Sequence, residues 1–194
     1  MDNIIIEKVI NNNIISAYEK SGAEVIVMGR GIGFKKKQGE VVPADQISKI
    51  FRIKSRTLTE QFKELLANMP LERVRISDEI ISHAKDHLKL KLNQSIYVTL
   101  TDHINSAVAR YREGIALKNM MKIDIRKFYP KEYQVGMHAI EWIKEQTGED
   151  LGDDEAAFIA MHIVSAELNA QNIIDVNQIT ELINTVLQIV RIHF

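Results

Sequence analysis

The chain has 194 residues and a formal net charge of −1, with 45% hydrophobic and 26% charged residues, which is the usage of an ordinary globular protein. No stretch approaches the roughly 18 uninterrupted apolar residues of a membrane span, and the amino terminus lacks the basic region of a secretory signal, so the sequence predicts a cytoplasmic protein without a membrane partner. Because there is no cysteine, a disulfide framework, a thiolate zinc site and a cysteine nucleophile are excluded.

The charges are distributed unevenly along the chain. Residues 1–56 hold ten Lys/Arg and six Asp/Glu, whereas the other 138 residues hold fifteen basic and twenty acidic side chains. Two regions of opposite sign indicate two tasks. Because the basic region is short, its excess of positive charge is concentrated enough to attract a polyanion.

The first 56 residues predict a small antiparallel sheet of four strands. Residues 4–10 are rich in β-branched side chains, and the three asparagines at 11–13 favour a bend before residues 14–15. Residues 24–28 and 49–53 are the remaining strand candidates. So small a sheet has little core of its own, which predicts a homodimer through this sheet.

A glycine-rich basic loop occupies residues 29–39. Its GxGxG spacing differs from the GxGxxG of dinucleotide sites, and no GK[ST] motif occurs, so a nucleotide pocket is not expected. The loop offers flexible backbone, the guanidinium of Arg30, the aromatic ring of Phe34 and three lysines, which are the components of RNA recognition by stacking and charge. The alternative is a mobile hairpin loop with solvated lysines.

From residue 57 onward, apolar residues recur at helical spacing. Leu58, Phe62 and Leu66 mark the first helix, which stops near Pro70, and Ser77 before two acids is a start signal for the second. The helices expected are 57 to about 70, 77–92, 95–114, 131–146 and 153–169. A further amphipathic stripe runs through residues 175–194.

These patterns predict a multidomain α+β protein. We expect a β domain over residues 1–56, an all-α helical bundle over 57–172, and a third segment over 173–194 that begins another domain or forms a terminal helix.

Two histidines stand out on the expected helices. His103 follows Asp102 directly, but neighbours one apart on a helix point about 100° apart, so this carboxylate is not its evident orienting partner. His162 shares a helix face with Phe158 and Met161, and in an unfamiliar sequence it would read as a packed core histidine. A neutral imidazole near pH 7 is also a nucleophile for a phosphoryl group.

The remaining histidines suggest no site. His83 and His87 have the i, i+4 spacing of a zinc pair, but no acidic motif completes a site, and we expect them to face solvent. His138 and His193 belong to no motif. The sequence therefore predicts neither a metal nor a cofactor, and no nucleophile, base and oxyanion set for an enzyme.

Several motifs, in order along residues 4 to about 170, resemble one family. KVINNN at 8–13 and VMGRGIGF at 27–34, with Lys36 and Gly39, resemble the co-antiterminator RNA-binding domain of the BglG/SacY/LicT family of bacterial transcriptional antiterminators. SIYVTLTDH at 95–103 and FIAMHIVS at 158–165 resemble the two histidine motifs of the family's first phosphotransferase-system (PTS) regulation domain, and FYPKE at 128–132 fits the same domain.

The resemblance implies a function. A dimer of the β domain would grip an antiterminator hairpin in nascent leader mRNA and exclude the overlapping terminator stem. Sugar-specific PTS permeases, with the general phosphocarrier protein as a further possible donor, would phosphorylate His103 and His162 when their sugar is absent, which silences the protein. The implied RNA contacts are Lys8, Asn11, Asn13, Gly29, Arg30 and Phe34, with Asn12 and Gly31 shaping the loops.

One departure and two alternatives accompany this interpretation. Family members usually carry two regulation domains, whereas only one fits here before a segment resembling the start of the second, so activation through a second domain is not assumed. The histidines could instead be catalytic in a hydrolase or phosphotransferase. Alternatively, the β region only dimerises, and the bundle is a protein-binding phosphohistidine sensor.

Overall fold

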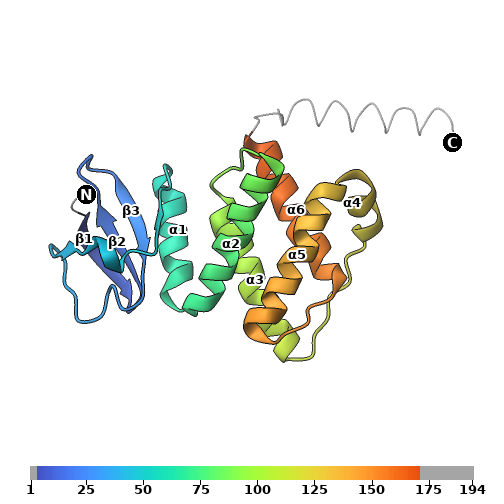
Figure 1. Cartoon of the computed structure of the whole chain (residues 1–194), viewed down its shortest axis with the longest axis horizontal. Coiled ribbons are helices and arrows are strands. Elements are labelled where there is room, and N and C mark those ends of the chain that lie inside the picture. Colours follow the sequence, from blue (N-terminus) through green and yellow to red (C-terminus); the bar gives the residue numbers. More distant parts are fainter. Residues whose placement is uncertain (1–3, 171–194) are drawn as a thin grey trace.

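The computed structural model describes residues 4–170 as an α+β fold with a sheet at one end and helices at the other (Figure 1). The sheet is antiparallel and has five strands in the order β4-β1-β2-β3-β5. The strands are β1 Ile4–Asn11, β2 Ile14–Tyr18, β3 Glu24–Met28, β4 Val41–Val42 and β5 Lys49–Phe51. The segment predicted over 173–194 lies outside the described residues.

The predicted strand count of four was wrong, because β4 was missed. This strand has two residues and pairs with the outer edge of β1, where Ile4 faces Val42 and Ile5 faces Val41. Two residues are too few to show the alternation that identifies a strand in a sequence. The other four strands lie where the sequence predicts them.

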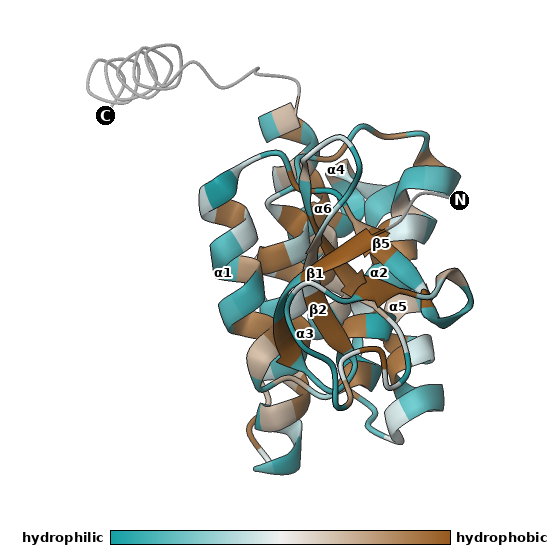
Figure 2. Cartoon of the chain, turned by 90° about the vertical axis from the view of Figure 1, so that its left-hand side faces the viewer, coloured by the Kyte–Doolittle hydropathy of each residue, from teal (hydrophilic) through white to brown (hydrophobic). Residues whose placement is uncertain are grey.

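The two faces of the sheet bury separate apolar clusters. Along β1, Ile4 and Ile6 are buried while Ile5 between them is exposed, as the period of two requires. Figure 2 shows the hydrophobic strands surrounded by hydrophilic loops. One cluster contains Ile4, Ile6, Ile15, Ala17, Val25, Val27, Ile32 and Val42. The other contains Ile14, Ile26, Met28, Phe51 and Ile53 together with side chains of the first helix.

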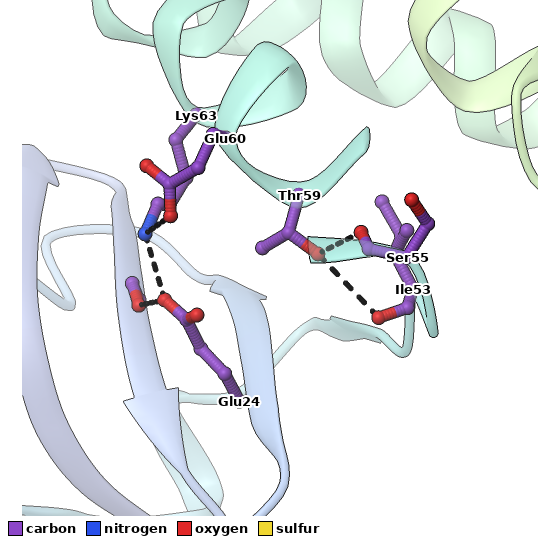
Figure 3. Close-up of polar contacts among 7 residues, drawn as sticks. Glu24, Ile53, Ser55, Thr59, Glu60 and Lys63 are labelled. Carbon is purple, nitrogen blue, oxygen red and sulfur yellow. Dashed lines mark hydrogen bonds and ion pairs between the residues drawn. The ribbon is translucent and has the colours of Figure 1, made fainter. Parts of the chain in front are cut away.

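The first helix, α1 (Arg56–Ala67), packs between the sheet and α3 (Ile96–Arg112), so the prediction of a separate helical bundle over residues 57–172 was not exact. Phe62 and Leu66 are buried in the second sheet cluster, not in the core of the other helices. Lys63 extends from α1 to Glu24 of β3 at 2.7 Å, as Figure 3 shows. The apolar stripe of α1 has the same spacing whether it faces a helix or a sheet, so periodicity alone could not choose its partner.

Within residues 4–170, five further helices form the bundle. They are α2 Leu71–Leu88, α3 Ile96–Arg112, α4 Lys122–Phe128, α5 Pro130–Thr147 and α6 Asp153–Ala170. Helix α5 packs against α2 and α6, and α3 packs against the same two helices. Among the described helices, none has the length and apolar character to cross a membrane.

Two helix predictions need correction. Helix α2 begins six residues before Ser77, directly after Pro70, and the Ser77 hydroxyl is buried and donates to the Arg73 carbonyl at 2.8 Å. The Ser77 hydroxyl thus forms its hydrogen bond within the helix, so Ser77 does not cap the start of α2. Helix α4 was not predicted, because it has seven residues and buries only Ile125, so it shows no apolar stripe.

The sheet and the bundle share an aromatic contact. Tyr97 of α3 lies 5.4 Å from Phe51 of β5 and 6.2 Å from Phe62 of α1, measured between ring centroids. Lys49 of β5 also forms a 2.9 Å ion pair with Asp78 of α2. The helices of the bundle therefore contact the same sheet that supports the glycine-rich loop.

Candidate nucleic-acid interface and histidine pair

The glycine-rich loop presents its cationic and aromatic side chains to solvent. Arg30 and Gly31 are exposed, and Phe34 is 57% exposed with the ammonium of Lys35 lying 5.3 Å from its ring centroid. Gly31 has φ +69°, a left-handed conformation that disfavours a side chain. An exposed ring beside flexible backbone and positive charge can stack on an unpaired base.

Two glycines allow this loop to lie close to neighbouring backbone. A Cβ at Gly29 would lie 1.9 Å from the Gln46 carbonyl oxygen, and one at Gly33 would lie 2.3 Å from the Asn11 carbonyl oxygen. The amide of Gly33 also donates to the Asn12 carbonyl at 3.0 Å. Glycine is therefore required here for close approach, and the contact holds the loop against the asparagine bend.

The asparagine side chains hold the two loops together in the free protein. Asn11 donates from Nδ2 to the Leu66 carbonyl at 2.9 Å and accepts from the Asn13 amide at 2.8 Å. Asn13 in turn accepts from the Gly31 amide at 2.9 Å. Asn13 therefore joins the bend to the glycine-rich loop through its side chain, and Asn12 does so through its backbone carbonyl while its side chain is exposed.

Lys8 is also exposed, on β1 before the asparagine bend. The structure therefore gathers the predicted contact residues on β1, the bend after it and the loop after β3.

A groove of about 820 Å³ lies beside the loop, between the sheet and α2. Asn13 and Arg30 line one side, and Arg75, Asp78 and Glu79 line the other. The glycine-rich loop and α2 consequently share one groove.

The two motif histidines meet although they are 59 positions apart. His103 of α3 and His162 of α6 have ring centroids 4.8 Å apart, and Phe158 lies 5.7 Å from the His103 ring. Asp102 is exposed and is not the partner of His103. Glu155 at the start of α6 takes that role, with Oε2 lying 2.9 Å from His103 Nε2.

Glu155 is a buried carboxylate with two partners. Burial raises the pKa of Glu155, but its hydrogen bonds and charge interactions with His103 and Arg110 outweigh this, so the net pKa lies below its usual value. Arg110 donates to Oε1 at 3.0 Å. Sequence reasoning missed Glu155 and Arg110. The sequence did contain a signal for both residues. Glu155 lies seven residues before His162, and Arg110 lies seven residues after His103, which is about two helical turns in each case.

His162 is neutral over the physiological range. Burial lowers the pKa of His162 to about 4, with a further decrease from the neighbouring His103, while Glu155 acts in the opposite direction. The ring therefore keeps an unprotonated nitrogen near pH 7, as a phosphoryl acceptor requires.

This pKa predicts a pH dependence of stability. Because the folded pKa is below the unfolded value of about 6.5, the contribution of neutral His162 is complete above about pH 6.5 and is lost as the pH falls toward 4. Over that interval we expect the free energy of unfolding of the wild type to fall by up to about 3 kcal/mol more than that of His162→Gln. Denaturant titrations at several pH values measure this difference, and parallel profiles would contradict it.

A second histidine group lies between α2 and α5, and it corrects the expectation of a solvent-facing pair. His83 and His87 are stacked with centroids 5.2 Å apart, and Trp142 lies 5.0 Å from His83. His87 is exposed, but His83 is partly buried, and its Nε2 has no hydrogen-bond partner. Within residues 4–170, no group of three or more His, Cys, Asp or Glu side chains is placed to hold a metal.

The small sheet carries an exposed basic loop, and the helices that contact this sheet enclose a pair of histidines. This combination is typical of a two-domain regulatory protein that binds nucleic acid. Residues 4–60 match the CAT RNA binding domain family, and residues 78–166 match the PRD domain family. The chain belongs to the BglG/SacY/LicT family of transcription antiterminators.

Individual relatives support this membership. The chain is 46% identical over 191 residues to transcription antiterminator LicT of Bacillus subtilis (strain 168), covering 97% of this chain and 68% of that protein. It is 39% identical over 186 residues to the beta-glucoside operon antiterminator of Dickeya chrysanthemi, covering 96% and 65%. The crystal structure of GlcT CAT-PRDI superposes with a TM-score of 0.73 at 35% identity, covering 85% of this chain and 98% of that one. The chain thus spans about two thirds of the two curated relatives.

Proposed function

We propose that this chain binds an RNA hairpin in nascent leader mRNA as a homodimer and so prevents the terminator from forming. The observation that carries the proposal is the exposed loop with Arg30 and Phe34, held by the asparagine bend. The match to the CAT RNA binding domain and the naming of the relatives as antiterminators support it. Those relatives are named for antitermination and not for catalysis, and we propose no enzymatic role.

The loop chemistry suits a hairpin with unpaired bases. Phe34 offers a face for base stacking, and Arg30 offers a planar fork of donors for a phosphate or a guanine edge. The exposed Lys8, Lys35 and Lys37 add positive charge on the same region of the domain. Recognition then combines stacking, hydrogen bonding and charge without any covalent step.

The sheet offers a surface for the second copy. Ile5, Tyr18 and Val41 are each more than 40% exposed, and Ile5 pairs directly with both of the others across neighbouring strands. An exposed apolar row of this kind is unfavourable in water and is buried when two sheets associate. A dimer would place two basic loops on one hairpin.

Regulation is proposed to act through His103 and His162. A sugar-specific PTS permease, or the general phosphocarrier protein, would transfer a phosphoryl group to an unprotonated imidazole nitrogen: a phosphorus–nitrogen bond forms, and the bond from phosphorus to the donor breaks. The added negative charge would lie where the His103 and His162 rings pack between α3 and α6, and the cost of desolvating it there would loosen the contact of these two helices.

The test is a gel shift with the chain's own leader RNA at two salt concentrations. Because lysines and arginines release counterions from phosphates, a dimer making about six phosphate contacts should lose roughly a thousandfold in affinity between 50 and 200 mM salt. Affinity that is unchanged by salt would contradict charge-based binding. Tight dimers without RNA affinity at low salt would instead favour the protein-binding phosphohistidine sensor.

A further inference from the structure

We infer that Glu155 fixes the tautomer of His103, so that Nδ1 and not Nε2 of this ring accepts the phosphoryl group. The inference rests on the proposed phosphorylation of His103 and names the atom that reacts. Glu155 is a positioning residue in this account, since it acts through the imidazole.

Both oxygens of the Glu155 carboxylate have hydrogen-bond partners. Oε2 of Glu155 lies 2.9 Å from His103 Nε2, and Oε1 accepts from Arg110 at 3.0 Å. The Glu155 side chain is only 8% exposed. Both oxygens are therefore occupied in a buried setting, and the carboxylate cannot turn to solvent without leaving two hydrogen bonds unmade.

In the hydrogen bond between His103 and Glu155, the imidazole is the donor. An ionised carboxylate only accepts, so the proton between the two groups belongs to Nε2 of His103. A neutral imidazole carries one ring proton, which leaves the lone pair on Nδ1. The arrangement follows the logic by which a buried aspartate sets the tautomer of a catalytic histidine.

The two ring nitrogens of His103 have different surroundings. None of the described residues hydrogen-bonds to Nδ1, and it is not among the buried polar atoms of residues 4–170 that lack a partner. The His103 side chain is 15% exposed, and Nδ1 is the ring nitrogen that Glu155 leaves uncovered. Nε2, by contrast, is covered by a negative carboxylate that would repel an incoming phosphate.

The reaction balances on this atom. The Nδ1 lone pair attacks phosphorus, the bond from phosphorus to the donor atom breaks, and the donor keeps that electron pair. The proton stays on Nε2, so the ring becomes positively charged as the new bond forms. Glu155 stabilises that charge at 2.9 Å, which favours transfer as well as choosing the atom.

The first experiment measures the tautomer without any phosphorylation. Long-range ¹H–¹⁵N NMR of the ¹⁵N-histidine-labelled chain at mildly alkaline pH should show an unprotonated Nδ1 and a protonated Nε2 at His103, assigned by loss of its signals in His103→Gln. Glu155→Gln should abolish this preference, because its amide can also donate to the ring. The matched control is Glu149→Gln, since Glu149 is another buried glutamate paired with an arginine of α3, Arg112 at 2.6 Å. It should leave the His103 tautomer unchanged.

The second experiment reads the phosphorylated isomer. After treatment with phosphoramidate, a small-molecule phosphoryl donor, ³¹P and ¹⁵N NMR should identify the Nδ1 isomer at the assigned His103 ring, and Glu155→Gln should add the Nε2 isomer. An unprotonated Nε2 in the free wild type, or the Nε2 isomer at His103 of the wild type, would overturn the inference. A His103 that PTS donors never phosphorylate in the cell would count against the proposed function, while the two NMR readings still decide the role of Glu155.

Discussion

Replacing Arg30 or Phe34 by alanine is expected to weaken binding of the leader hairpin by about 25-fold or more. Loss of one stacked base or one bidentate contact costs about 1–3 kcal/mol, which is roughly a fivefold to 150-fold loss per subunit, and a dimer suffers it twice. Both side chains are exposed, so the fold should remain intact. Gel-shift titration measures the affinity, and circular dichroism with thermal melting measures the fold.

Matched controls exist in the regulation domain. Phe128 is 64% exposed, close to the 57% of Phe34, and Arg126 is exposed like Arg30. Phe128→Ala and Arg126→Ala remove the same chemical groups at a distance from the glycine-rich loop, and we expect wild-type affinity from both. Wild-type binding by Arg30→Ala and Phe34→Ala would remove the loop from the RNA interface.

Joint replacement of His103 and His162 by alanine is expected to make read-through constitutive. Without an acceptor imidazole, neither ring can be phosphorylated when the sugar is absent, so the dimer stays competent for RNA binding. A reporter placed after the terminator should give the same expression with and without the sugar. Retained sugar dependence in the double variant would contradict regulation through these two rings.

Two further variants keep this test interpretable. The His103→Ala substitution leaves one buried oxygen of Glu155 without a partner, which destabilises the bundle. A second double variant, His103→Gln with His162→Gln, retains a hydrogen-bond donor at position 103. His138 lies on the exposed surface of α5, and His138→Ala should keep normal sugar control. Loss of control in this variant would show that the effect is not specific to the histidine pair.

Secondary-structure elements were predicted correctly where the residues of one segment are sufficient to specify them. The strands of residues 4–28 follow β-branched runs and bends, and α6 begins and ends within a residue of its predicted bounds. The exposed loop around Gly31 was also predictable, because glycine and charge indicate it without reference to distant residues. Short elements such as β4 and α4 were missed, because two or seven residues show no reliable period.

The sequence by itself determined the class of fold, the order of the two domains, the exposed cationic loop and the histidines to examine, since each depends on residue types and spacing within one segment. Only the tertiary structure decided that α1 packs between the sheet and α3, that Asn11 binds the end of α1, and that Glu155 and not Asp102 orients His103. The reason is physical. Burial and hydrogen bonding depend on which surfaces meet, and partners such as His103 and Glu155, 52 positions apart, are brought together by packing alone.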